Sequence, residues 1–138
     1  MCSREALDQL LLKLYSQLEG LFGEHLKTVV LFGSYARGDA EEGSDVDVLV
    51  LVDLPRKEIV NYRRSVAAIA GEYLFSDGLL LSLLVENETF FERNCRILPF
   101  YQNIVREGVR TAGVATWYCR KGNPFAQRLH RKALLTFR

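Results

Sequence analysis

Two aspartates separated by a single residue open the apolar run DVDVLVLV at residues 45–52. On a β-strand, residues two apart point to the same face, so Asp45 and Asp47 are expected to project together. Two carboxylates this close repel each other, and a bound cation relieves the repulsion. Mg²⁺ prefers one or two carboxylates together with phosphate oxygens. The pair therefore predicts a divalent-metal site that acts on a phosphorylated ligand.

A Gly-Ser turn follows the preceding apolar run, KTVVLF, at residues 27–32. A helix that begins at such a turn presents backbone N–H groups to phosphate, and glycine lets the phosphate approach the backbone closely. We expect Gly33 and Ser34 to form this phosphate cradle, with Ser34 as the N-cap of a short helix that stops near Gly38. Arg37, in the same helical turn, can reach a phosphate or clamp a nearby carboxylate.

Helices that alternate with buried strands are the elements expected to position these residues. Hydrophobic periodicity predicts helices at residues 6–22, 34–38, 57–74, 88–93 and 99–107, and apolar runs predict strands at 27–32, 45–52 and 79–85. The third strand, LLLSLLV, has a buried helical segment as its alternative. The polar stretch DAEEGS at residues 39–44 is expected to be a loop. This alternation predicts a layered α/β fold, which some schemes class as α+β.

Composition and charge narrow the class of protein. The chain has 138 residues, of which 49% are apolar and 25% charged, as in a folded domain of ordinary size. The three cysteines are far apart, no stretch approaches a membrane span, and the polar N-terminus lacks a signal-peptide core, so we expect a cytoplasmic protein. All 17 acidic residues lie within residues 1–107, whereas residues 108–138 are basic. That basic end is either a solvated surface or a contact for an acidic partner or nucleic acid.

The combination of GSYARG, a short polar loop and SDVDVLV spans residues 33–50. It resembles GSxARG followed by SDxDLLV, the signature of nucleotidyltransferases that share the DNA polymerase beta fold. The chain length and leading helix look like the minimal nucleotidyltransferases (MNT), many of which are antitoxins paired with HEPN toxins. The resemblance covers roughly residues 5–109 and includes PFYQNIVREGV at 99–109, which is similar to the end of many family members.

The resemblance implies a small mixed β-sheet flanked by helices and a nucleotide site. In the family, the positions of Gly33 and Ser34 hold the triphosphate, and those of Asp45 and Asp47 bind Mg²⁺, with room for two ions. It implies transfer of AMP from ATP to a hydroxyl, of which a tyrosine of a HEPN partner is the expected example. Arg37 and Ser44, which lie within the two parts of the signature, are further candidates for nucleotide binding.

The chain departs from the family at the third carboxylate, which complete enzymes carry on a later strand. The matching strand here is LLLSLLV, and Ser82 is its polar residue. Glu86 shares a face with Ser82 if the strand extends that far, and Asp77 precedes the strand in a turn. Neither acid matches the family pattern cleanly, so the sequence supports nucleotide binding more firmly than catalysis.

Four functions remain open from the sequence. The first is an antitoxin-type nucleotidyltransferase that modifies its partner, and the second is a weak or inactive antitoxin that neutralises its partner by binding. The third is a nucleotidyltransferase for an aminoglycoside-type small molecule, although such enzymes usually carry an extra domain for the acceptor. The last is an α/β domain whose acidic strand end is merely solvated. We divide the chain into a nucleotidyltransferase domain at 1–109 and a basic extension at 110–138, and we do not expect nucleic acid to contact the domain at 1–109.

Overall fold

The computed structural model of the protein describes residues 3–107 and 109–110. Its helices are α1 (Arg4–Phe22), η1 (Gly23–His25), α2 (Ser34–Arg37), α3 (Arg56–Ile59), η2 (Val60–Tyr62), α4 (Arg63–Asp77), α5 (Glu88–Asn94) and α6 (Pro99–Glu107). Its strands are β1 (Leu26–Phe32), β2 (Val46–Val52), β3 (Leu81–Asn87) and β4 (Val109–Arg110). No helix in these described ranges is both long enough and apolar enough to span a lipid bilayer.

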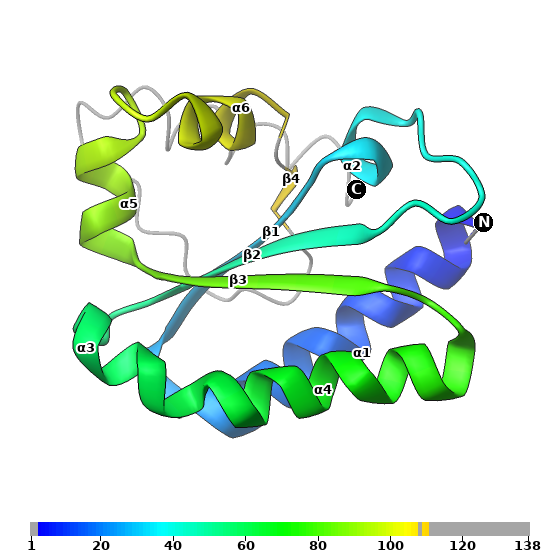
Figure 1. Ribbon diagram of the computed structural model, residues 1–138, viewed down its shortest axis with the longest axis horizontal. Coiled ribbons are helices and arrows are strands. Elements are labelled where there is room, and N and C mark those ends of the chain that lie inside the picture. The colour runs from blue at the N-terminus through cyan, green and yellow to red at the C-terminus, as the bar shows by residue number, and fades with distance from the viewer. Residues whose placement is uncertain (1–2, 108, 111–138) are drawn as a thin grey trace.

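The strands form one mixed sheet in the order β3-β2-β1-β4 (Figure 1). β1 pairs antiparallel with both β2 and β4, whereas β2 and β3 are parallel. Parallel neighbours need a long crossover connection, and α3, η2 and α4 provide it between β2 and β3. As a result, the start of β2 and the start of β3 lie at the same end of the sheet.

Helices cover both faces of the sheet, with α1 and α4 on one face and α5 and α6 on the other (Figure 1). The alternation of side chains along β2 divides the core accordingly. Val46, Val48 and Val50 are fully buried in the cluster that includes α1 and α4. Leu49 and Leu51 are fully buried in the second cluster, with residues of α5 and α6.

The predicted α/β alternation and mixed sheet are confirmed, with three local differences. The helix expected at residues 57–74 is broken into α3, η2 and α4. As predicted, the run LLLSLLV contributes a strand and not a helical segment, with β3 at Leu81–Asn87. β2 begins at Val46, so Asp45 lies just before the strand. The two-residue strand β4 was not predicted, because a pair of residues carries no periodicity. Beyond Arg110, the expected basic extension lies outside the described residues.

Candidate active site

The two motifs of the sequence meet where β1 ends and β2 begins. Phe32, the last residue of β1, pairs with Asp47 across the antiparallel ladder, so Gly33 follows immediately beside the Asp47 side chain. Gly33 has φ +77°, a conformation that favours glycine. A Cβ at this position would overlap Asp47 Oδ2 and would lie 3.1 Å from Asp47 Cγ. Because Gly33 has no side chain, the Asp47 carboxylate can occupy the space beside the Gly33 backbone.

The Asp47 side chain leaves the sheet on the face that carries α5 and α6. Asp47 is half-buried and alternates with Leu49, whereas Val46 and Val48 are buried on the opposite face. Asp45 is exposed, and the strand start is fixed by the Val46 N–H, which donates to the Leu80 carbonyl at 2.9 Å. Two accessible carboxylates beside a bare glycine backbone are a donor set that fits Mg²⁺ with phosphate oxygens as the remaining ligands.

Among the described residues, no third protein ligand completes this pair. Within residues 3–107 and 109–110, no group of three or more His, Cys, Asp or Glu side chains could hold a metal ion. The sequence outside these ranges contains no histidine, aspartate or glutamate except His130. A metal ion at Asp45 and Asp47 would therefore depend on a nucleotide or water for most of its coordination sphere.

The turn after β1 leads into α2, but its cap differs from the prediction. Gly33 is the N-cap and Ser34 is the first helical residue, so the prediction of Ser34 as N-cap is wrong. The Gly33 carbonyl accepts from the N–H groups of Ala36 and Arg37 at 3.1 and 3.0 Å. Ser34 is half-buried in the first turn of this helix, where its hydroxyl can serve a ligand. The helix ends at Gly38, as predicted.

Arg37 and Ser44 both take part in shaping the acidic loop. The Arg37 Nε donates to Asp39 Oδ2 at 3.1 Å, which is the carboxylate clamp that the sequence left open as one of two roles. The Ser44 Oγ accepts from the Glu41 N–H at 2.9 Å, and the Ser44 N–H donates to the Glu41 carbonyl at 3.0 Å. These hydrogen bonds stabilise the acidic loop at residues 39–44, which directly precedes Asp45 in the chain.

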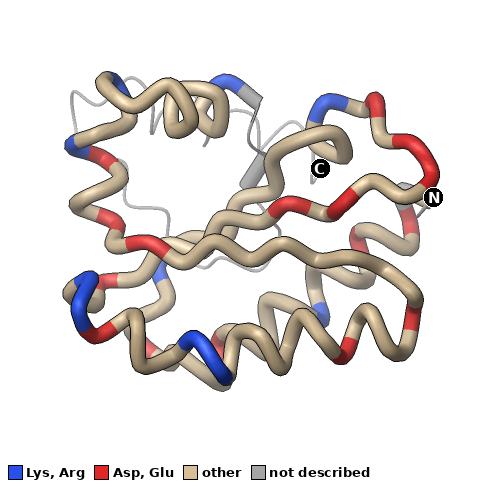
Figure 2. The backbone as a smooth tube through the Cα atoms, viewed as in Figure 1, with Lys and Arg blue, Asp and Glu red and all other residues tan. Residues whose placement is uncertain are grey.

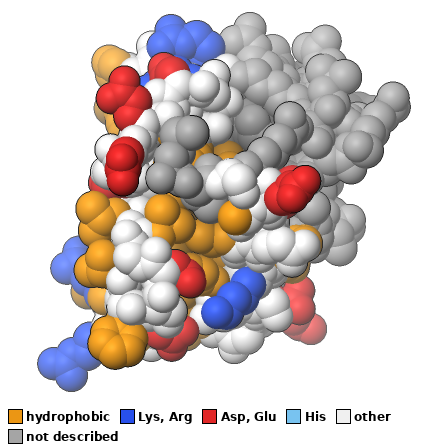
Figure 3. Space-filling model, turned by 90° about the vertical axis from the view of Figure 1, so that its right-hand side faces the viewer, with side chains coloured by type: hydrophobic (Ala, Val, Ile, Leu, Met, Phe, Trp, Pro, Cys, Tyr) orange, Lys and Arg blue, Asp and Glu red, His pale blue; other side chains and the backbone are white. Residues whose placement is uncertain are grey.

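Acidic residues gather at this end of the molecule. Figure 2 shows the loop after α2 and the start of β2 as a run of acidic positions, which includes Asp39, Glu41 and Glu42 besides the carboxylate pair. Figure 3 looks onto the same end and shows acidic side chains spread among hydrophobic and uncharged ones. Such a concentration of negative charge attracts divalent cations and disfavours a bare nucleotide.

Glu86, a candidate for the third carboxylate, lies at the far end of β3. It pairs with Leu51, four residues along β2 from Asp47, which corresponds to about 13 Å of strand. The side chain is 6% exposed. Its oxygens accept from Tyr101 Oη at 2.7 Å, from the Asn87 N–H at 2.9 Å and from Arg56 Nε at 3.3 Å. Glu86 therefore joins β3 to α6 and α3, and the structure does not bring it to the carboxylate pair.

The partners of Glu86, Tyr101 and Arg56, are themselves held in the same cluster. Burial, followed by the hydrogen bond to Glu86, raises the pKa of Tyr101 well above its usual range, so this phenol stays a donor. The Arg56 guanidinium also stacks on the Phe90 ring, 3.9 Å from its centroid. The cluster is a structural junction at the end of the sheet.

Asp77, the other candidate, lies on the opposite side of the sheet. It is the last residue of α4 and lines a cavity of about 720 Å³ between α1, α4 and the acidic loop. Tyr35 and Ser44 line the same cavity. Because α4 packs on the face away from Asp47, Asp77 does not face that carboxylate. The β3 residue that pairs with Asp47 is Ser82, which is exposed.

Comparisons with known proteins agree with this geometry. The family model described as "Nucleotidyltransferase domain" matches residues 11–109. The chain is 30% identical over 91 residues to "Putative protein adenylyltransferase MJ0604" of Methanocaldococcus jannaschii, which covers 66% of this chain and 83% of the relative. It is 43% identical over 67 residues to "Putative protein adenylyltransferase MJ1305" of the same organism, at 47% of this chain and 45% of the relative.

Solved structures show the same fold. A toxin–antitoxin crystal structure with AMP-PNP matches with a TM-score of 0.51 at 20% identity, over 91% of this chain and 82% of that chain. A mutant of the toxin–antitoxin MntA-HpeT gives the same TM-score at 18% identity and the same coverage. The family match spans both signature motifs and the sheet that brings them together. The chain therefore belongs to the nucleotidyltransferase domain family and is a nucleotidyltransferase.

Proposed function

We propose that the protein transfers AMP from ATP, with Mg²⁺, to a tyrosine hydroxyl of a HEPN partner and thereby acts as its antitoxin. The observation that carries the proposal is the contact between Asp47 and the Gly33 backbone. It supports the proposal because the Asp47 carboxylate lies beside the Gly-Ser turn that would bind phosphate. The relatives named as protein adenylyltransferases support a protein acceptor.

Each residue of the site has a defined part in this reaction. Gly33 and Ser34 would hold the triphosphate through the backbone and the Ser34 hydroxyl. Asp45 and Asp47 would hold Mg²⁺, which when bound supplies charge neutralisation at the phosphates. The acceptor oxygen forms a bond to the α-phosphorus while the bond from that phosphorus to the bridging oxygen breaks. Pyrophosphate leaves with that electron pair, and the acceptor proton passes to a base or to water.

A HEPN partner and ATP are inferred from the family that the signature resembles and from what the similar solved structures contain. Those structures are a toxin–antitoxin with AMP-PNP and the toxin–antitoxin MntA-HpeT. The described part of the chain is occupied by one sheet and its covering helices. An acceptor supplied by another chain suits this arrangement better than a small molecule that requires its own binding domain.

One observation favours a second function, in which the chain is a slow or inactive enzyme that neutralises its partner by binding. Ser82 lies beside Asp47, where a third carboxylate would complete the site. Glu86 and Asp77 are held elsewhere. General-base assistance typically contributes roughly 10²–10⁴-fold, so its loss slows transfer while leaving metal-dependent nucleotide binding in place.

The test mixes the protein with the product of its neighbouring gene, ATP and Mg²⁺, and reads the intact mass of both chains. We expect a mass increase of one or more AMP groups on the partner, and none with the Asp45→Asn/Asp47→Asn variant. Asp53→Asn is the matched control, because this aspartate pairs with His25 and Lys27 beyond the other end of β2.

A stable complex of the two chains without an adduct would favour the binding antitoxin. Neither adduct nor complex would overturn both functions.

A further inference from the structure

β3 is an edge strand of the sheet formed by the described residues. Within the part of the chain that the structure describes, β3 pairs with β2 alone, and that ladder has no irregularity over its seven residues. Proteins usually protect such an edge with proline, a bulge or an outward charge. β3 has no proline, and its one charged residue, Glu86, is buried against Tyr101. Nothing on the strand itself therefore opposes pairing with a further strand.

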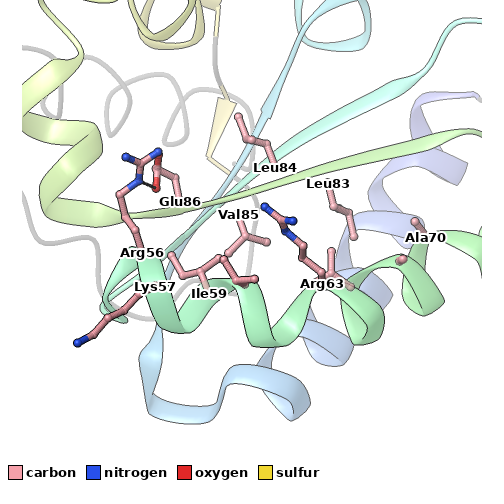
Figure 4. Close-up of a pocket in the computed structure, with 12 residues that line it drawn as sticks. Arg56, Lys57, Ile59, Arg63, Ala70, Leu83, Leu84, Val85 and Glu86 are labelled. Carbon is pink, nitrogen blue, oxygen red and sulfur yellow. Dashed lines mark hydrogen bonds and ion pairs between the residues drawn. The ribbon is translucent and has the colours of Figure 1, made fainter.

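A groove runs along this edge, between β3 and the α3–η2–α4 connection (Figure 4). Its volume is about 670 Å³, and its lining is largely apolar. Val60 is 48% exposed there, and Leu83 and Val85 point from β3 toward the helices. An apolar hollow beside an unpaired strand edge is the arrangement by which extended peptides are bound through strand addition.

Positive side chains line the rim of the groove. Arg63 extends from α4 toward β3 and lies near Leu83 and Val85 (Figure 4). Within the described residues, neither Arg63 nor Lys57 makes an ion pair, whereas Arg56 is bound to Glu86. A guanidinium that lies against apolar side chains presents a planar set of donors suited to a carboxylate.

We propose that the β3 edge and its groove bind an extended acidic segment of a partner protein. The segment adds as a strand beside β3, its apolar side chains fill the groove, and a carboxylate pairs with Arg63. A second copy of this chain fits the charge less well, because the one carboxylate on β3, Glu86, is buried and already engaged by Arg56 and Tyr101. Paired β3 strands would thus bring no carboxylate to Arg63.

This docking site is separate from the candidate active site. The groove lies on the face of the sheet that carries α4, whereas Asp47 leaves the opposite face. Occupation of the groove therefore leaves the carboxylate pair accessible. The inference does not rest on AMP transfer, and the Asp45→Asn/Asp47→Asn variant is expected to bind the segment as the wild type does.

The probe for the test is a fluorescein-labelled peptide of about nine residues that alternates valine with glutamate, titrated with the full chain by fluorescence anisotropy. We expect saturable binding that Arg63→Glu weakens at least about tenfold. Arg64→Glu is the matched control, because this neighbouring exposed arginine does not line the groove. A peptide that alternates valine with lysine should bind the Arg63→Glu variant better than the wild type.

A second variant tests the groove independently, in case Arg63→Glu loses binding because it misfolds. Ala67→Trp fills the groove from its exposed rim on α4 and should also weaken binding, while circular dichroism stays unchanged. Absence of saturable binding, or equal losses with Arg63→Glu and Arg64→Glu, would overturn the proposal. So would sedimentation showing a dimer that Ala67→Trp dissociates, since a second copy would then occupy the edge.

Discussion

Ser82 lies directly opposite Asp47 in the parallel ladder of β2 and β3, and both side chains leave the same face of the sheet. A serine hydroxyl carries no charge and is a weaker metal ligand than a carboxylate. Position 82 could supply a third metal ligand and a general base. Its serine binds a metal less strongly, and accepts a proton less readily, than a carboxylate would. We therefore expect this pairing to limit the rate of AMP transfer.

Replacing Ser82 with aspartate is expected to accelerate AMP transfer. The new carboxylate would lie beside Asp47 and could accept the acceptor proton, so the rate should rise by about ten- to a thousandfold. The rate of adduct formation on the partner, followed by intact mass, measures the effect. Ser76→Asp adds the same charge on an exposed position of α4 and should leave the rate unchanged. An unaltered rate in Ser82→Asp would mean that this position does not face the reacting groups.

Alanine at Gly33 is expected to remove nucleotide binding. Its Cβ would overlap the Asp47 carboxylate, and its φ of +77° would strain any L-residue by about 1–2 kcal/mol. Gly38→Ala separates the two effects, because Gly38 has φ +84° but a Cβ added there would meet no atom within 4 Å. Both variants should lose stability in urea unfolding, Gly33→Ala the more because of the overlap with Asp47, and only Gly33→Ala should lose Mg²⁺-dependent ATP binding in calorimetry. Equal ATP affinity in the two variants would contradict the phosphate-cradle assignment.

The sequence was sufficient for those parts of the site that depend on local pattern. The alternation in DVDVLVLV correctly separated Asp47 from the valine face, and glycine after a strand correctly marked the turn. The partner of Ser82 and the position of Glu86 depend on the register between β2 and β3. Register is a contact between distant segments, so Glu86 could share a face with Ser82 in the sequence and still lie about 13 Å along the strand from the site.

The groove beside β3 was not found from the sequence for the same reason. Arg63 and Lys57 look like solvent-exposed charges on a helix, and LLLSLLV looks like a fully buried strand. Only the sheet order shows that β3 is at an edge, and only the path of α4 brings Arg63 beside it.

The folded state is expected to lose stability in alkali through Tyr73. Burial, with smaller contributions from Glu72 and Asp77, raises the pKa of Tyr73 from 10.0 to about 12. Because the folded state favours the neutral phenol, this contribution is fully present below pH 10 and is lost as the pH rises toward 12. Urea unfolding across this range should show wild-type stability falling more steeply than that of Tyr73→Phe. Parallel curves would show that Tyr73 ionises equally in both states.

The same variant should be less stable at neutral pH. Tyr73 Oη donates to Gln17 Oε1 at 2.6 Å, so Tyr73→Phe loses about 1 kcal/mol of unfolding free energy there. The difference between wild type and variant should therefore narrow as the pH approaches 12. Gln17→Ala, which removes the acceptor but keeps the phenol, should lower stability at neutral pH and retain the alkaline loss.

Valine at position 28 is expected to stabilise the fold. Thr28 is completely buried in β1, and its Oγ1 has no hydrogen-bond partner among the described residues. A buried hydroxyl without a partner costs about 1–3 kcal/mol, and valine has nearly the same shape without the hydroxyl. Urea unfolding should show Thr28→Val to be more stable by about 1 kcal/mol, with unchanged ATP binding. Thr28→Ser keeps the unpaired hydroxyl and loses a methyl group, so it should be less stable than the wild type. A loss of stability in Thr28→Val would show that the hydroxyl has a partner, such as water, in solution.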